Sequence, residues 1–87
     1  MARYDLEISR TAERQLRRLP RADQARVVQA MLQLATDPYP RGTRKLLGYD
    51  DVFRIRVGQY RVLYSVSEAT VIVVVLKIGH RRDVYRR

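Results

Sequence analysis

Three arginines in this chain are spaced so that they could act together on an anionic group. Residues 52–66 form two alternating apolar and polar runs around a central Gly-Gln pair, a pattern that predicts a β-hairpin with a two-residue turn. In that register Arg56 lies opposite Arg61, and Arg54 lies on the same face. Like charges that face each other across two strands repel. An anionic ligand would relieve this repulsion.

Most other chemistries are disfavoured by the composition. The chain has one histidine and no cysteine, and Asp50 and Asp51 alone make a poor metal site, so we predict no metal and no cofactor. No serine has an obvious base, and there is no glycine-rich phosphate loop. Guanidinium groups bind phosphate and stabilise charge on its oxygens. The arginine cluster, with His80 and Tyr85, therefore suits phosphodiester chemistry.

Arginine is a poor proton acceptor, because its pKa exceeds about 12. A base in such a reaction would be His80, Tyr85, a perturbed lysine or a group that a partner supplies. The sequence leaves these alternatives open.

The first forty residues predict a strand and two helices that would support the hairpin. Residues 3–8 alternate between apolar and polar side chains, as in a half-buried strand. Ser9 suits the N-cap of a helix over residues 10–19, and Pro20 suits the first turn of a second helix that ends near Thr36. The predicted apolar stripe of the second helix consists of Ala25, Val28, Met31 or Leu32, and Ala35.

The second half of the chain predicts a loop and three strands. Residues 39–51 contain the proline and glycine signals of a loop. The apolar face of the hairpin that follows consists of Phe53, Ile55, Val57, Tyr60, Val62 and Tyr64. Residues 70–78 are apolar at both parities, with Val71, Val73 and Val75 on one side and Ile72, Val74, Leu76 and Ile78 on the other. This strand should lie centrally or be covered on both faces.

We therefore expect one α+β two-layer domain over residues 1–87, with the element order β-α-α-β-β-β. A helical hairpin would pack on one face of a mainly antiparallel four-stranded sheet, and a short basic C-terminal tail would follow.

The charge is strongly positive and concentrated in two segments. Lysine and arginine number 18 against nine acidic residues, and segments 41–61 and 77–87 each carry a net charge of +4. This footprint indicates a nucleic acid, an anionic membrane surface or an acidic protein as partner. The longest apolar run, 71–76, is too short for a membrane span, and residues 1–5 do not show the apolar core of a signal peptide. We expect a soluble cytoplasmic protein without a membrane partner.

Two motifs give a more specific interpretation. The Gly-x-Tyr-Arg turn at 58–61 and the His-Arg-Arg-x-x-Tyr tail at 80–85 resemble the RelE/ParE superfamily of bacterial type II toxin–antitoxin systems, on its RelE side. The resemblance covers essentially the whole chain. It implies a metal-independent endoribonuclease, an mRNA interferase that cuts messenger RNA in the ribosomal A site and inhibits translation. It also implies a cognate antitoxin that neutralises the toxin in a hetero-oligomer and often binds the operator.

The resemblance also assigns roles to the basic residues and to Tyr85. Arg61 would contact the scissile phosphate in the transition state, Arg81 would act as acid toward the leaving oxygen, and Tyr85 would orient or stack the nucleotide. Arg54 and Arg56 stand where well-studied members carry two lysines, one of them proposed as the base that activates the ribose 2′-hydroxyl. Further RNA or ribosome contacts are predicted at Arg41, Arg44, Lys45, Lys77 and Arg82.

His80 occupies a position that is often basic in the family, and it becomes an alternative acid or base. Cleavage would leave a 2′,3′-cyclic phosphate and a 5′-hydroxyl. The two arginines in place of lysines keep two alternatives open: a ParE-like, non-enzymatic inhibitor of DNA gyrase, or an RNA-binding module that has lost catalysis.

Overall fold

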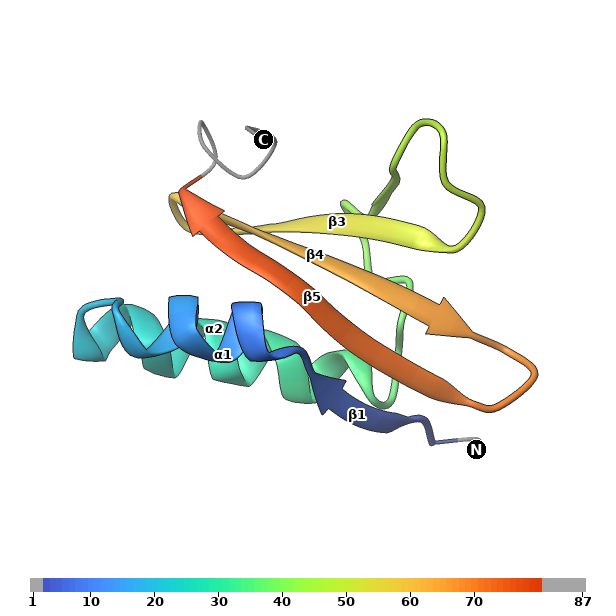
Figure 1. Ribbon diagram of the computed structural model, residues 1–87, viewed down its shortest axis with the longest axis horizontal. Helices are drawn as coiled ribbons and strands as arrows, with labels where there is room; N and C mark the ends of the chain where they lie inside the picture. Colours follow the sequence, from blue (N-terminus) through green and yellow to red (C-terminus); the bar gives the residue numbers. More distant parts are fainter. Residues whose placement is uncertain (1–2, 81–87) are drawn as a thin grey trace.

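The computed structural model describes residues 3–80, in which two helices cover one face of a five-stranded sheet (Figure 1). The elements are β1 (Asp5–Ile8), α1 (Arg10–Arg17), α2 (Arg21–Leu34), β2 (Arg44–Lys45), β3 (Val52–Val57), β4 (Tyr60–Ser67) and β5 (Ile72–His80). The strand order is β1-β5-β4-β3-β2, and only β1 and β5 pair in parallel. This is the predicted two-layer α+β architecture. No helix in the described residues is long and apolar enough to cross a bilayer.

The helices begin where the sequence predicts, but the predicted apolar stripe of α2 is confirmed only at Met31 and Ala35. Ser9 caps α1, because its hydroxyl accepts a hydrogen bond from the Ala12 amide at 3.0 Å. The same hydroxyl donates to the carbonyl of Leu76 on β5 at 2.8 Å, which joins the start of α1 to the sheet. The core-facing stripe of α2 consists of Val27, Met31, Leu34 and the adjoining Ala35. Ala25, Val28 and Leu32 are exposed.

This correction has a simple cause. The α2 sequence contains two overlapping apolar stripes, and periodicity alone does not show which one the sheet covers. The stripe with i, i+4, i+7 spacing from Val27 packs into the same core as Tyr64, Val73 and Val75.

The β3–β4 hairpin has the predicted register. The pairs are Phe53 with Tyr64, Arg54 with Leu63, Ile55 with Val62, Arg56 with Arg61, and Val57 with Tyr60. Gly58 has a positive φ of 60°, a conformation that glycine adopts without strain and that a two-residue hairpin turn requires. The arginine pair therefore lies on one face of the hairpin and the apolar residues lie on the other.

The predicted four-stranded sheet is wrong by one strand. The segment predicted as a loop contains the two-residue strand β2, in which Arg44 pairs with Arg54 and Lys45 pairs with Phe53. Two residues are too few to show an alternating pattern, and Gly42 and Gly48 on either side give turn signals. Strand β2 brings one more cation to the edge of the sheet.

Strand β5 lies centrally, as predicted, but its alternation is broken. Tyr64 pairs with Val75 while Leu63 pairs with Lys77, so Leu76 is an extra residue in a β-bulge. Beyond the bulge the faces exchange. Ile78 joins Val75 in the core, contrary to the prediction that they lie on opposite sides.

Candidate functional site

The face of the sheet that the helices leave uncovered carries cations from four strands. Residues that pair directly across strands share a face. One row across this face consists of Arg44, Arg54, Leu63 and Lys77, and the next consists of Arg56, Arg61 and Gly79. We call this set of five basic residues the cationic face.

The cationic face contains a hollow beside strand β3. It has a volume of about 360 Å³ and is lined by Gly42, Arg44, Arg54, Ile55, Arg56 and Arg61. Arg54 and Arg61 are half-buried, whereas Arg44 and Arg56 are exposed. Among residues 3–80 no carboxylate lines the hollow. A phosphodiester placed there would meet several guanidinium groups, which bind phosphate oxygens in pairs and stabilise charge that develops on them.

The loop between α2 and β2 positions one wall of this hollow and is held by Tyr64. The Tyr64 side chain is fully buried, and its hydroxyl donates to the carbonyl of Pro38 at 2.8 Å. The hydroxyl oxygen of Thr43 lies 3.3 Å from the hydroxyl oxygen of Tyr64. Burial raises the pKa of Tyr64 above its ordinary value. These contacts fix both ends of the segment that carries Gly42 to the rim of the hollow.

A second attachment of the loop uses Glu68, in the turn between β4 and β5. Tyr39 and Tyr4 donate hydrogen bonds to its two carboxylate oxygens, that of Tyr4 at 2.6 Å. Both bonds lower the pKa of Glu68, and the bond from Tyr39 has the larger effect. The pKa of Tyr39 is raised, mainly because of burial and then because of its bond to Glu68. The Tyr39 ring also stands edge-on to Phe53, with centroids 5.2 Å apart. Three separate segments are therefore tied together here.

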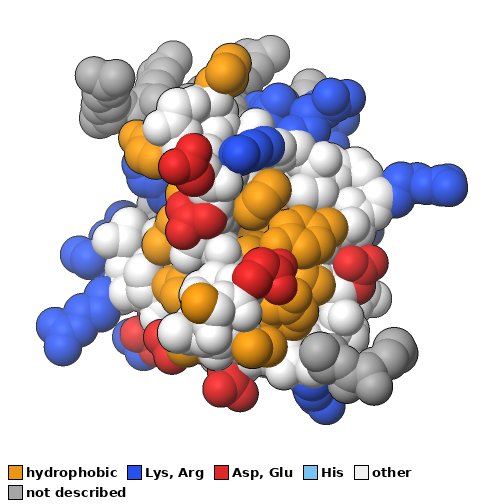
Figure 2. All heavy atoms as spheres, turned by 90° about the vertical axis from the view of Figure 1, so that its right-hand side faces the viewer, with side chains coloured by type: hydrophobic (Ala, Val, Ile, Leu, Met, Phe, Trp, Pro, Cys, Tyr) orange, Lys and Arg blue, Asp and Glu red, His pale blue; other side chains and the backbone are white. Residues whose placement is uncertain are grey.

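This end of the molecule differs in character from the cationic face. Figure 2 views the side that lies at the right in Figure 1, where the β4–β5 turn is. Hydrophobic and acidic side chains gather in the middle of that view, and most basic side chains lie toward its margin. An anionic ligand would therefore approach the sheet elsewhere.

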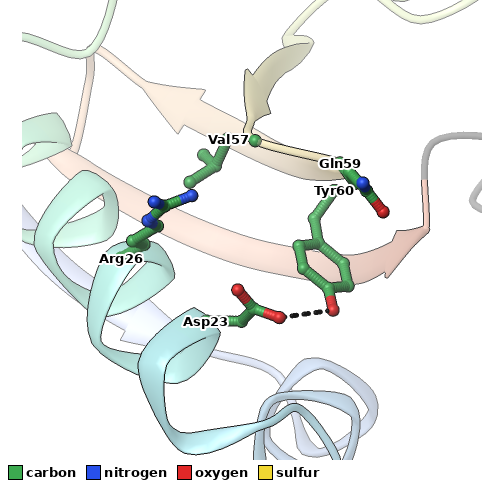
Figure 3. A pocket seen from close by; sticks show the side chains of 6 residues that line it. Asp23, Arg26, Val57, Gln59 and Tyr60 are labelled. Carbon is green, nitrogen blue, oxygen red and sulfur yellow. Dashed lines mark hydrogen bonds between the residues drawn. The ribbon is translucent and has the colours of Figure 1, made fainter.

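The hairpin turn is fixed to α2 by a tyrosine next to Arg61. The Tyr60 hydroxyl donates to a carboxylate oxygen of Asp23 at 2.9 Å (Figure 3), and this bond raises the pKa of Tyr60. The guanidinium of Arg26 lies beneath the turn. Any side chain in place of Gly58 would put its Cβ atom 3.5 Å from this guanidinium. A hollow of about 210 Å³ separates the turn from α2. The bond between Tyr60 and Asp23 could not be predicted, because no local sequence pattern links residues so far apart.

The structure separates two predicted site residues from the cationic face. His80 pairs with Tyr60, and their rings are 6.1 Å apart in an edge-on arrangement, so His80 lies on the helix side of the sheet, away from Arg61. Lys45 pairs with Phe53 and also points away from the cluster. Arg41 lines a neighbouring hollow that shares Arg56 with the first. Arg81, Arg82 and Tyr85 lie outside the described residues.

The arrangement supplies positive charge without an evident metal centre. Within residues 3–80 no group of three or more histidine, cysteine, aspartate or glutamate side chains is placed to hold a metal ion. The chemistry that the described residues can perform is the binding of phosphate groups and the stabilisation of negative charge.

Comparisons with known proteins agree with this fold. Residues 6–85 match the family model described as the ParE toxin of the type II toxin–antitoxin system, parDE. The chain is 38% identical over 88 residues to toxin RelG of Mycobacterium tuberculosis, covering 97% of this chain and 98% of that protein. It is 29% identical over 87 residues to putative toxin RelE1 of Methanocaldococcus jannaschii, covering 97% of each.

Two solved structures are similar over nearly the whole fold. One is the archaeal RelE–RelB complex from Pyrococcus horikoshii, with a TM-score of 0.82, 32% identity, and coverage of 95% of this chain and 99% of that one. The other is the toxin–antitoxin complex RelBE2 from Mycobacterium tuberculosis, with a TM-score of 0.80, 32% identity, and coverage of 91% and 99%. The chain therefore belongs to the ParE toxin family of type II toxin–antitoxin systems, within the RelE/ParE superfamily.

Proposed function

We propose that this toxin is an endoribonuclease that cuts messenger RNA in the ribosomal A site and thereby inhibits translation. The observation that carries the proposal is the hollow on the cationic face, where Arg44, Arg54, Arg56 and Arg61 converge from three strands. A single-stranded RNA presents one phosphate per nucleotide, so neighbouring phosphates can contact neighbouring arginines. The toxin would act in the cytoplasm, where messenger RNA is translated.

The cleavage proceeds through attack by the ribose 2′-oxygen on the adjacent phosphorus, in line with the leaving 5′-oxygen. The new bond is P–O2′ and the broken bond is P–O5′, so the products are a 2′,3′-cyclic phosphate and a 5′-hydroxyl. Arg61 holds the scissile phosphate and stabilises the charge on its oxygens, while Arg54 and Arg56 hold the flanking backbone. The leaving oxygen takes a proton, from Arg81 in the assignment that the resemblance implies.

A cognate antitoxin neutralises the toxin in a hetero-oligomeric complex. Support comes from the similar chains, which were solved as the RelE–RelB and RelBE2 complexes. In many such systems, as the resemblance implies, the antitoxin also binds the operator. An antitoxin that covers the cationic face would block RNA by direct competition.

The test is to induce the toxin without its antitoxin and to map 5′ ends on cellular messages. Wild-type toxin should produce new 5′ ends inside translated codons and arrest growth. Arg61→Ala should reduce cleavage about 100–1,000-fold, the usual effect of removing one group that stabilises a transition-state oxyanion. Arg14→Ala is the matched control, because this exposed arginine lies on α1 in the other layer. Full cleavage by Arg61→Ala would contradict the site assignment.

A second candidate function is inhibition of DNA gyrase without catalysis. The matching family model, which is named for ParE, favours it. The arginines at positions 54 and 56 also favour it, because well-studied members of the RelE side, which this chain resembles, carry two lysines there. In that case induction would trigger the DNA-damage response while messages stay intact. The same induced culture therefore separates the two functions.

A further inference from the structure

The cationic face holds phosphate well but offers few groups that can accept a proton. Arginine is a poor proton acceptor, because its pKa exceeds about 12. His80 pairs with Tyr60 on the helix side, so the sheet itself separates its ring from a ribose bound over Arg61. Within residues 3–80 the remaining candidates for the base are therefore other groups on the helix-free side. Tyr85, which lies outside these residues, and a group from the ribosome are the alternatives that the test must separate.

Lys77 is the one lysine on this face. The chain has two lysines, and the other, Lys45, lies opposite Phe53 and points away from the cluster. Lys77 pairs with Leu63, and Arg61 pairs with Gly79, which lies two positions beyond Lys77 on β5. Lys77 and Arg61 are therefore diagonal neighbours, with Cα atoms about 7–8 Å apart, a separation that long side chains bridge.

The surroundings of Lys77 leave its amine available. The residue opposite Arg61 on β5 is Gly79, which follows Lys77 on the same face of the strand. Because glycine has no side chain, this position leaves the surface beside Lys77 open. Within residues 3–80 the Lys77 ammonium forms no ion pair with a carboxylate that would hold it in the charged form. Unlike arginine, lysine can lose its proton and serve as a general base.

We propose that Lys77 is the general base of RNA cleavage, an inference that rests on the endoribonuclease function proposed above. Its neutral amine takes the proton from the 2′-hydroxyl of the nucleotide whose 3′-phosphate Arg61 holds. The 2′-oxygen bonds to phosphorus as the P–O5′ bond breaks, and Lys77 leaves the step as an ammonium. The 5′-oxygen takes a proton from Arg81, the acid that the resemblance implies, or from a water molecule. Lys77 then returns its proton to solvent. The lysine function absent at positions 54 and 56 is thus supplied from β5.

The test compares Lys77→Arg with Arg14→Lys in single-turnover cleavage of messenger RNA on programmed ribosomes, across a range of pH. Lys77→Arg keeps the positive charge but removes the group that can lose a proton. We expect cleavage to fall at least 100-fold, within the range for loss of a general base. Ribosome binding, measured with a 2′-O-methylated message that cannot react, should change less than about threefold. Arg14→Lys, at an exposed position of α1 in the other layer, should match wild type in both assays.

The pH profile gives an independent measurement. Wild-type cleavage should rise with pH as the neutral amine becomes more abundant, and this rise should be lost in Lys77→Arg. In Lys77→Ala, added ethylamine should restore cleavage in proportion to its neutral form.

Three outcomes would overturn the proposal. If Lys77→Arg cuts at the wild-type rate with the same pH profile, Tyr85, the ribosome or water supplies the base, and the endoribonuclease function stands. If cleavage and binding fall together in Lys77→Arg, Lys77 is a phosphate contact, as predicted from the sequence. If wild-type toxin cuts no message at all, the endoribonuclease function fails and this inference fails with it.

Discussion

Removing the Tyr64 hydroxyl should destabilise the fold through the loop that borders the candidate site. Tyr64→Phe deletes the hydrogen bond to the Pro38 carbonyl at 2.8 Å and leaves that carbonyl buried without this partner. A lost hydrogen bond costs about 0.5–1.5 kcal/mol, and an unsatisfied buried acceptor about 1–3 kcal/mol. We therefore expect a loss of about 2 kcal/mol in the free energy of unfolding. For a domain of this size that lowers the melting temperature by roughly 8–16 °C.

Urea and thermal unfolding followed by circular dichroism would measure this loss. Tyr49→Phe is the matched control, since Tyr49 is 58% exposed and its change should stay within about 0.5 kcal/mol. The urea m-value should be the same in both variants, because the surface exposed on unfolding is unchanged. Equal stability of Tyr64→Phe and Tyr49→Phe would refute the reasoning, because water would then satisfy the Pro38 carbonyl as well as the phenol does.

Three further changes test other parts of the structure. The pKa of Glu68 lies below its ordinary value of 4.5, so the stability that this carboxylate contributes is present above about pH 4.5 and is lost as the pH falls through the lowered pKa. In urea titrations at acid pH, the free energy of unfolding of Glu68→Gln should therefore depend less on pH than that of the wild type. Ala12→Leu should cost about 1–3 kcal/mol by overpacking a fully buried position, whereas Ala25→Leu on the exposed side of α2 should be nearly neutral in thermal unfolding. Arg44→Gln should lower the slope of log RNA affinity against log salt by about 0.7, the value for one phosphate contact to a single strand.

The hairpin was predictable from the sequence because several local signals agree there. Two alternating runs, a Gly-Gln turn and the need to bury one apolar face leave a single register. That register places Arg56 opposite Arg61, so the centre of the candidate site could be located before any tertiary contact was known. The same argument fails for β2, whose two residues carry no pattern.

The contacts that hold the site in place could not be predicted, because they join residues distant in sequence. Tyr64 reaches Pro38, Tyr60 reaches Asp23, and Glu68 binds Tyr4 and Tyr39. Each bond depends on the packing of helices and loops against the sheet, which no local periodicity encodes. The predicted stripe of α2 was wrong at Ala25 and Val28 for the same reason, since the sheet determines which of two apolar faces is covered.

The β-bulge at Leu76 has the largest effect on the chemistry that this face can support. Strict alternation from Val73 and Val75 would place Lys77 in the core and Ile78 on the surface. Burying an unpaired ammonium would cost several kcal/mol. Leaving the isoleucine exposed would forfeit about 1.5–3 kcal/mol of burial. One extra residue removes both penalties, because it sends Ile78 into the core and Lys77 to the cationic face. It also turns His80 toward the helices, so a single register shift determines which proton acceptor lies near Arg61.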